Sequence, residues 1–214
     1  MDENGTDQYN DSHEGWKSID TALAGLYPGQ DPAHFGTLMR YSEGGPDPLD
    51  GMSAYVATSP DGTCHWHFVS YGLTELYEKT SEDASESGWG FELTFRLGKE
   101  VNETKPAMWP LNLLQTLARY VFNTGEVFGH GHYIEMGGSL VNSRPTDLTA
   151  LVFNRDPQLP AVESPNGRFE FIQAVGITDQ EYKWIQANDP ELFLAKYHQA
   201  DPLMITVLKR PSLV

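Results

Sequence analysis

The sequence predicts an α+β fold: a mixed, largely antiparallel central sheet flanked by helices in a single domain. Short segments of alternating apolar and polar residues, typical of half-buried strands, recur along the chain, and segments with apolar residues at helical spacing lie among them. Strands precede, separate and follow the helices without regular alternation, which favours α+β over a repeating βαβ arrangement. The 214 residues, of which 39% are hydrophobic and 12% aromatic, are enough for one domain with a substantial core.

The predicted helices are recognised by their apolar spacing and by their start and stop signals. The first ends at Pro28-Gly29, the second has Pro110 in its first turn and Gly125 after its end, and Thr178 with Glu181 forms the capping-box pattern of the third. The predicted ranges are 16–27, 110–123, 178–187 and 190–198.

The predicted strands are separated by turn-forming residues. Gly44-Gly45-Pro46-Asp47-Pro48 is expected to form a rigid loop, and Ser59-Pro60-Asp61-Gly62 the turn of a hairpin. Residues 71–77 are predicted to form a short helical turn, and the polar segment 78–87 an exposed loop. The predicted strands are 34–41, 52–57, 63–70, 90–97, 149–154, 168–175 and 203–209.

The amino-terminal segment is predicted to be a disordered acidic lead-in over residues 1–14, with the folded domain over 15–214. The lead-in has no positive charge and no apolar segment, so it does not look like a signal peptide. The longest apolar runs, such as Ala150–Phe153, are too short to cross a bilayer. The lone cysteine, Cys64, favours a reducing, cytoplasmic location, and we expect its thiol to be buried and inert within a strand.

The net charge of −16, from 30 acidic and 14 basic residues, restricts the partners of the protein. A surface this negative repels phosphate backbones and anionic lipid, so neither direct nucleic-acid binding nor membrane binding is expected. A basic partner would be attracted instead, although many acidic proteins carry their charge only for solubility.

Residues that could carry chemistry are few. The sequence has no phosphate-binding loop, no HExxH, no GxSxG and no CxxC motif. His65 and His67 share one face of a predicted strand and could join His130 and His132, with Glu135 nearby, in a metal site. Packing is the more common use of such histidines, so neither a metal nor another cofactor is expected.

Acid–base and nucleophilic alternatives are weaker still. Asp47, Asp50 and Glu92 are the carboxylates in ordered segments, but acidic residues are abundant throughout the chain. Cys64 and His65 point to opposite faces of a strand, so they do not form a nucleophile–base pair. From the residues alone, the chain is predicted not to be an enzyme.

Several motifs resemble the Suppressor of fused family, in the same order along the chain. GFELTFRL preceded by YGLTELY is the most specific of them, and the resemblance covers residues 16–210. The matching segments are Gly44–Asp50, His65–His67, Ser70–Tyr77, Ser87–Leu97, Trp109-Pro110, Leu117–Phe122, Asp156–Gln158, Gly167 and Phe171–Gly176.

The resemblance implies a protein-binding function. Animal members of the family look like two-lobed regulators of Hedgehog signalling that hold Gli-type zinc-finger transcription factors by a peptide added as a strand. This chain matches the first lobe, and Ile205-Thr206-Val207 departs from the family, which commonly has an Asp in the last of these positions. Single-domain bacterial relatives resemble immunity proteins that neutralise a toxin.

The resemblance also implies partner-binding residues. Asp156 matches a family position that faces the peptide cleft, and Asp47, Asp50 and Tyr71 match family positions that serve either binding or the fold. Gly72, Trp89 and Arg96 match as well, and Glu92 is expected to pair with Arg96 on one strand face.

The function that we predict is sequestration or inhibition of a partner polypeptide without catalysis. An immunity protein that neutralises a basic toxin domain is the first interpretation, and an exposed sheet edge that accepts a peptide strand is the expected binding mode. Regulation of transcription through protein contacts and a metal-dependent enzyme built on the two histidine pairs are the alternatives.

Overall fold

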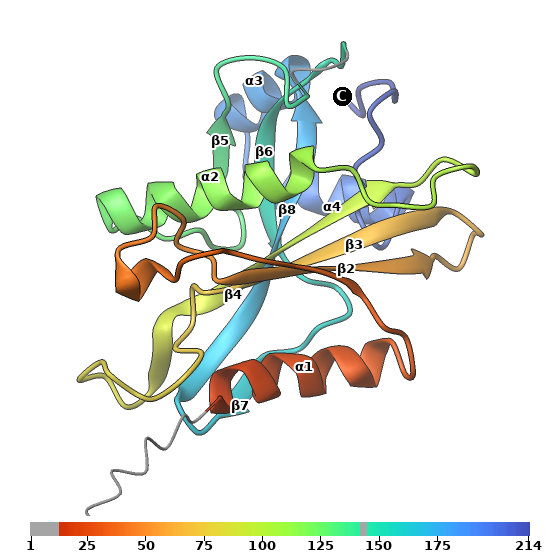
Figure 1. Cartoon of the computed structure of the whole chain (residues 1–214). Coiled ribbons are helices and arrows are strands. Elements are labelled where there is room, and N and C mark those ends of the chain that lie inside the picture. The colour runs from red at the N-terminus through yellow and green to blue at the C-terminus, as the bar shows by residue number, and fades with distance from the viewer. Residues whose placement is uncertain (1–12, 142–144) are drawn as a thin grey trace, which may run out of the picture.

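The computed structural model describes residues 13–141 and 145–214, which form an eight-stranded mixed sheet with helices on both faces (Figure 1). The strand order is β1-β2-β3-β4-β8-β6-β5, with β7 paired to the end of β8. The central pair, β4 and β8, is parallel and the other pairs are antiparallel, which confirms the predicted fold class. The strands are β1 (Ala33–Gly36), β2 (Gly51–Thr58), β3 (Cys64–Tyr71), β4 (Glu86–Gly98), β5 (Tyr133–Glu135), β6 (Leu148–Arg155), β7 (Val162–Ser164) and β8 (Gly167–Thr178).

Most helix ends lie at the signals that the sequence carries, but α1 begins two residues before its predicted start, without a side-chain cap at His13. They are α1 (Glu14–Leu26), α2 (Trp109–Thr124), α3 (Asp179–Ala187) and α4 (Pro190–Ala200), with a short 3-10 helix at Tyr41–Glu43. The capping box of Thr178 and Glu181 is formed, and Gly125 ends α2 in the left-handed conformation, donating its N–H to the carbonyl of Val121.

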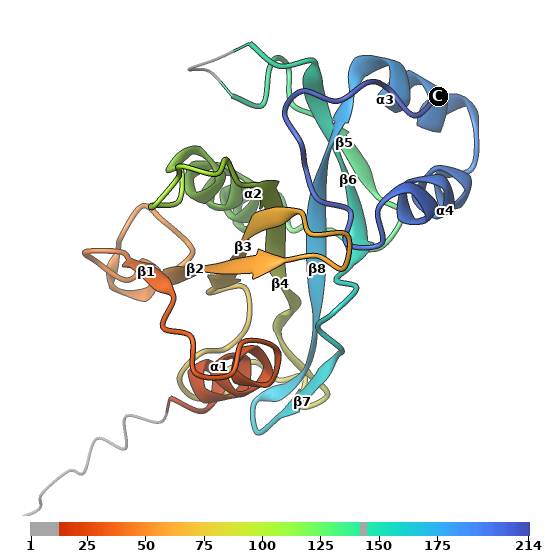
Figure 2. The same cartoon turned by 90° about the vertical axis from the view of Figure 1, so that its right-hand side faces the viewer.

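Helices α1 and α2 cover opposite faces of the sheet, and α3 and α4 cover the far ends of β6 and β8 (Figures 1 and 2). Alternation along β8 explains this layout: Phe169 and Phe171 pack in the cluster with α1, whereas Val175 and Ile177 pack with α3 and α4. All four side chains stand at odd-numbered positions of β8 and so point to the same side of the strand. Helix α1 and the α3–α4 pair therefore cover the same face of the sheet. Gln173 lies between these two apolar clusters on the same face.

The family motifs fold against one another around a loop at residues 72–74. Glu92 is fully buried, and its Oε1 accepts hydrogen bonds from the backbone N–H groups of Gly72, Leu73 and Thr74 and from the Thr74 hydroxyl. Its Oε2 accepts from the hydroxyl of Ser70 at 2.5 Å. Gly72 has φ 144°, and a Cβ there would lie 2.7 Å from the carbonyl oxygen of Pro48, so the close approach of these loops requires glycine.

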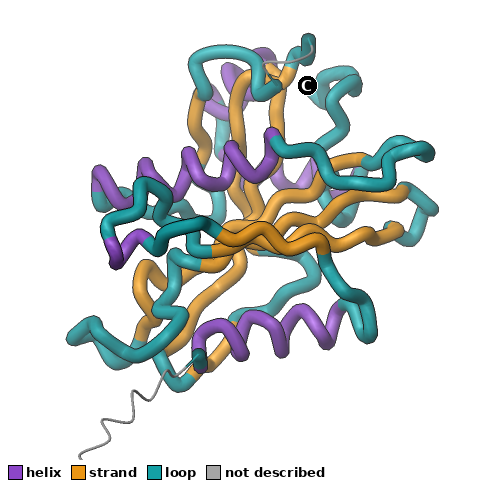
Figure 3. The backbone as a smooth tube through the Cα atoms, viewed as in Figure 1, coloured by secondary structure: helices purple, strands orange, loops and turns teal. Residues whose placement is uncertain are grey.

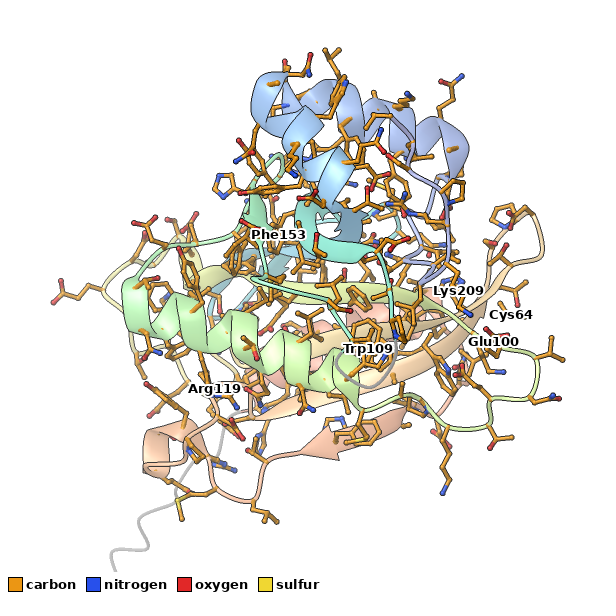
Figure 4. The ribbon with its side chains drawn as sticks, turned by 90° about the horizontal axis from the view of Figure 1, so that it is seen from above. Cys64, Glu100, Trp109, Arg119, Phe153 and Lys209 are labelled. Atoms are coloured by element: carbon orange, nitrogen blue, oxygen red, sulfur yellow. The ribbon has the colours of Figure 1, made fainter. Side chains whose placement is uncertain are left out.

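Four local predictions are wrong. Residues 71–77 form no helical turn, because the N–H groups of the loop donate their hydrogen bonds to the carboxylate of Glu92. Glu92 therefore serves this loop, and it is not the partner of Arg96. Residues 203–209 form only one bridge, Leu97 with Thr206, because the carbonyls of Leu203 and Met204 accept instead from the side chain of Gln173. Cys64 is exposed, because it lies at the first position of β3, at the rim of the sheet (Figure 4).

The strands β5 and β7 were not predicted, since each has only three residues. The strand predicted at 34–41 is observed as the shorter β1, which ends at Gly36, and the 3-10 helix follows after a few residues. Of the predicted acidic lead-in, 1–14, only His13 and Glu14 lie within the described residues, and Glu14 begins α1. No helix among the described residues is long and apolar enough to cross a membrane. Figure 3 shows that loops make up much of the periphery around the sheet.

Replacing Glu92 with leucine should destabilise the protein by about 3 kcal/mol or more, because buried donors that lose their acceptor each cost about 1–3 kcal/mol. Urea unfolding monitored by circular dichroism measures this loss. Glu92→Gln is the matched control, and it should cost less because its amide oxygen still accepts from the loop. A Glu92→Leu variant as stable as the wild type would contradict this role.

Candidate functional site

Asp156, the foremost partner-contact candidate, is buried directly after β6. Its carboxylate binds the Arg96 guanidinium in a bidentate pair, with Nη1 at 2.6 Å from Oδ2 and Nη2 at 2.9 Å from Oδ1. The hydroxyl of Thr94 also donates to Oδ2, and the backbone N–H groups of Gln158 and Leu159 donate to Oδ1. The side chains of Asp156 and Arg96 are both 0% exposed.

The Arg96–Asp156 pair is the centre of a buried polar cluster. Nε2 of His67 lies 3.2 Å from Oδ2 of Asp156, a close polar contact that is not a hydrogen bond. Nδ1 of His67 lies 2.6 Å from the hydroxyl of Tyr27 at the end of α1. Arg96 also donates to Oε1 of Gln173, whose amide group donates to the carbonyls of Leu203 and Met204. The cluster thus joins α1, β3, β4, β8 and the carboxyl-terminal segment.

The charges of the cluster are balanced inside the protein. Burial alone would raise the pKa of Asp156, but the charge of Arg96 is the largest of the effects that outweigh burial and hold that pKa well below its ordinary value. Burial, assisted by the Arg96 charge, lowers the pKa of His67 to about 4, so this imidazole is neutral at pH 7. Asp156 therefore supports the chain behind any binding surface, and its direct contact with a partner stays a prediction.

The other three candidates lie in separate places and do not converge with Asp156. Asp47 forms a salt bridge with Arg119 of α2, the residue that Figure 4 labels on that helix. Asp50 accepts a hydrogen bond from the Tyr77 hydroxyl at 2.9 Å. Tyr71 is buried and donates to Oδ1 of Asp20 on α1 at 2.9 Å. Asp47 thus ties a loop to α2, the Asp50–Tyr77 bond joins two loop segments, and Tyr71 ties α1 to β3.

The two histidine pairs do not form a metal site. Within the described ranges, no three His, Cys, Asp or Glu side chains are placed to hold a metal ion. His65 and His67 lie buried under the α1 side of the sheet, whereas Nε2 of His130 lies 2.9 Å from Glu191 of α4. The metal-enzyme alternative therefore loses its structural basis.

Among the described strands the sheet ends at β5, whose outer edge pairs with none of them and lies beside a hollow of about 370 Å³. Three large side chains in its wall are notably exposed: Tyr120 by 38%, Val127 by 45% and Tyr133 by 37%. Phe128, stacked on Phe153 with ring centroids 4.2 Å apart, lines the same hollow from the core side. Glu126, His132 and Ile134 also line it.

Sequence reasoning missed this edge because β5 is too short to show an alternation pattern. The sequence did carry one signal for this edge, a group of aromatic residues within 120–133. Only some of them belong to the apolar stripe of α2, so the others needed a separate explanation.

The fold defines a class of protein: an α+β domain with a mixed sheet whose described strand order runs from β1 to β5. The family model described as Suppressor of fused protein matches residues 45–211, so the chain belongs to the Suppressor of fused family. The Suppressor of fused homologues of Homo sapiens and Mus musculus are each 37% identical to it. Those alignments cover 86% of this chain and 41% of each homologue, so the chain spans less than half of their length.

Solved structures agree with this assignment. The crystal structure of Drosophila Suppressor of Fused superimposes with a TM-score of 0.88 at 32% identity, covering 94% of this chain and 52% of that one. A chain of the Sufu–Fu complex crystal structure gives 0.87 at 33% identity, covering 94% and 93%. A Neisseria gonorrhoeae homologue shares the fold, with a TM-score of 0.61 at 16% identity and coverage of 92% and 96%.

His67 should make the stability of the protein sensitive to acid. Its folded-state pKa, about 4, lies below the ordinary 6.5, so the unfolded chain binds a proton that the folded chain excludes. The contribution of the neutral His67 to the free energy of unfolding is complete above pH 6.5. As the pH falls towards 4, this contribution of about 3 kcal/mol is lost.

The difference in free energy of unfolding between wild type and His67→Gln, measured by urea unfolding from pH 4 to pH 7, isolates this contribution. Burial raises the pKa of Glu92 to about 7, so the Glu92 contribution is lost as the pH rises from 4.5 to 7 and opposes that of His67. A wild-type curve alone would mix the two. A difference that does not change with pH would contradict a neutral, buried His67.

Proposed function

We propose that this protein is a regulatory binding protein that holds an extended segment of a partner polypeptide along the free edge of β5. The observation that supports this most is the coincidence, at one place, of an unpaired strand edge and a hollow with exposed aromatic walls. Backbone hydrogen bonds to a sheet edge give affinity to an added strand, and side-chain pockets beside it give specificity.

The backbone of β5 offers the groups that an added strand needs. The His132 carbonyl accepts from the Phe153 N–H and the Met136 N–H donates to the Thr149 carbonyl, so these positions face β6. Because the direction of the backbone groups alternates along a strand, Tyr133 and Glu135 direct their N–H and C=O groups towards the free edge. The hollow lined by Tyr133 and Phe128 then lies where a partner side chain can enter it.

Membership of the Suppressor of fused family favours regulation through protein contacts over neutralisation of a toxin. The human and mouse relatives are Suppressor of fused homologues, and another similar chain was solved in the Sufu–Fu complex. The charge of −16 favours a partner with a basic segment and disfavours direct nucleic-acid or membrane binding. The single cysteine and the family are both consistent with function in the cytoplasm.

A proline at the free edge tests this proposal. Glu135→Pro removes an N–H that points away from β6, so it should weaken partner binding at least about tenfold by removing one strand–strand bond and by clashing with the added strand. Glu135→Gln removes the same charge but keeps the N–H, and it should bind nearly as the wild type does.

The measurement is affinity purification from the native host with the three tagged chains, followed by titration of the recovered partner against each purified chain. Equal affinity of the three for that partner would contradict binding at β5. Thermal unfolding of the proline variant within a few degrees of the wild type shows that the loss is local.

A further inference from the structure

A second hollow, of about 540 Å³, lies at the other edge of the sheet, between α1 and strands β1 and β2. Its wall combines aromatic rings with carboxylates. The residues that matter most are Trp16 and Asp20 on α1, Tyr27 at its end, Asp31 before β1, His34 on β1, and Tyr55 on β2. This hollow shares no lining residue with the hollow beside β5.

The aromatic rings of this wall are held in fixed positions. Tyr27 and Tyr55 stack with ring centroids 4.6 Å apart, and Trp16 stacks on the buried Tyr71 at 4.5 Å. The ring of His34 lies 5.8 Å from that of Trp16, and Nδ1 of His34 lies 2.9 Å from the Ser53 hydroxyl. Tyr27 and Tyr55 are buried, at 8% and 6% exposed, and stack on each other, so they form a fixed floor, and the half-buried Trp16 is the ring that a ligand can reach.

The charge of the wall is negative. Asp20 is oriented by the hydroxyl of Tyr71, which donates to Oδ1 at 2.9 Å, so Oδ2 is available to a ligand. Asp31 supplies a second carboxylate, and no lysine or arginine lines the hollow. Burial lowers the pKa of His34, more than the nearby Asp20 raises it, so the imidazole adds no positive charge at neutral pH.

We propose that this hollow binds the cationic side chain, lysine or arginine, of a basic polypeptide segment. Aromatic rings attract a cation through the negative potential of their faces, and adjacent carboxylates add direct charge attraction. The same chemistry already occurs elsewhere in the chain: Arg40 lies over Tyr77, Lys99 over Trp66 and Arg210 over Tyr197. The rings of the hollow have no such internal cation among the described residues, and the net charge of −16 attracts a basic segment.

This site is separate from the edge of β5 and does not depend on the proposed function. A phosphate or carboxylate ligand would meet two carboxylates and no compensating cation in the wall. The aliphatic stem of lysine or arginine can pack along rings while its charged end reaches Asp20 or Asp31.

The test uses the full chain and a blocked tri-lysine peptide as the probe. Binding is followed by the NMR resonance of the Trp16 indole N–H, assigned from the spectrum of Trp16→Phe. We expect saturable displacement of this resonance, and no displacement by the same peptide with its lysines acetylated. An unmoved Trp16 resonance, or equal binding of the acetylated peptide, would overturn the proposal.

Two double variants distinguish the hollow from the general charge of the protein. Asp20→Asn with Asp31→Asn should weaken probe binding about three- to tenfold, because each exposed ion pair contributes modestly. Glu78→Gln with Glu82→Gln removes the same charge from an exposed loop, and it should change binding less than about twofold. Equal weakening by the two double variants would refute the site.

Discussion

The buried pair of Arg96 and Asp156 is the interaction on which the rest of this structure depends. Placing two charges out of water is costly, and the cost is met only if they pair closely and their remaining hydrogen-bonding groups are satisfied. Both carboxylate oxygens of Asp156 accept several hydrogen bonds, and Arg96 takes Gln173 and Gln158 as further acceptors, so that only Nε of Arg96 lacks a partner among the described residues. Since these acceptors come from β8 and from the loop after β6, the pair fixes the positions of segments far apart in sequence.

The polar cluster also explains how one sheet face carries two separate apolar cores. The core under α1 and the core under α3 and α4 share a face of β8, and Gln173 and Arg96 lie between them. His67 and Tyr27 connect the cluster to α1, while Gln173 connects it to the carboxyl-terminal segment. With the centre of the sheet fixed in this way, β1 and β5 form the two outer edges of the described sheet. The hollow at β5 has exposed apolar walls and the hollow at β1 an acidic, aromatic wall, so the two edges suit different ligands.

The sequence predicted correctly those helix ends and turns that depend only on residues close to them in the chain. The capping box at Thr178, the glycine after α2 and the hairpin turn at Ser59–Gly62 act over a few residues, so the sequence is sufficient to place them. The resemblance to the Suppressor of fused family rested on long motifs, and the family match confirms it.

The remaining errors involve contacts between distant residues. Glu92 and Arg96 are close in sequence, but one binds the loop at residues 72–74 and the other binds Asp156, which no local pattern reveals. The strand expected at 203–209 was displaced by side-chain bonds from Gln173. Asp156 matched a cleft position by resemblance, yet its burial became evident only when Thr94, Arg96 and His67 were seen around it. The edge at β5 was missed because three residues carry too little pattern.

A double-mutant cycle on the central pair tests this account most directly. The free energy of unfolding in urea would be measured at pH 7 for the wild type, Arg96→Met, Asp156→Asn and the double variant. Each single change should cost about 3–5 kcal/mol, because it leaves a partner buried without its counter-charge, and the double variant should cost at least about 2 kcal/mol less than their sum. Small, additive losses would show that the pair does not hold the sheet together, and would contradict the account.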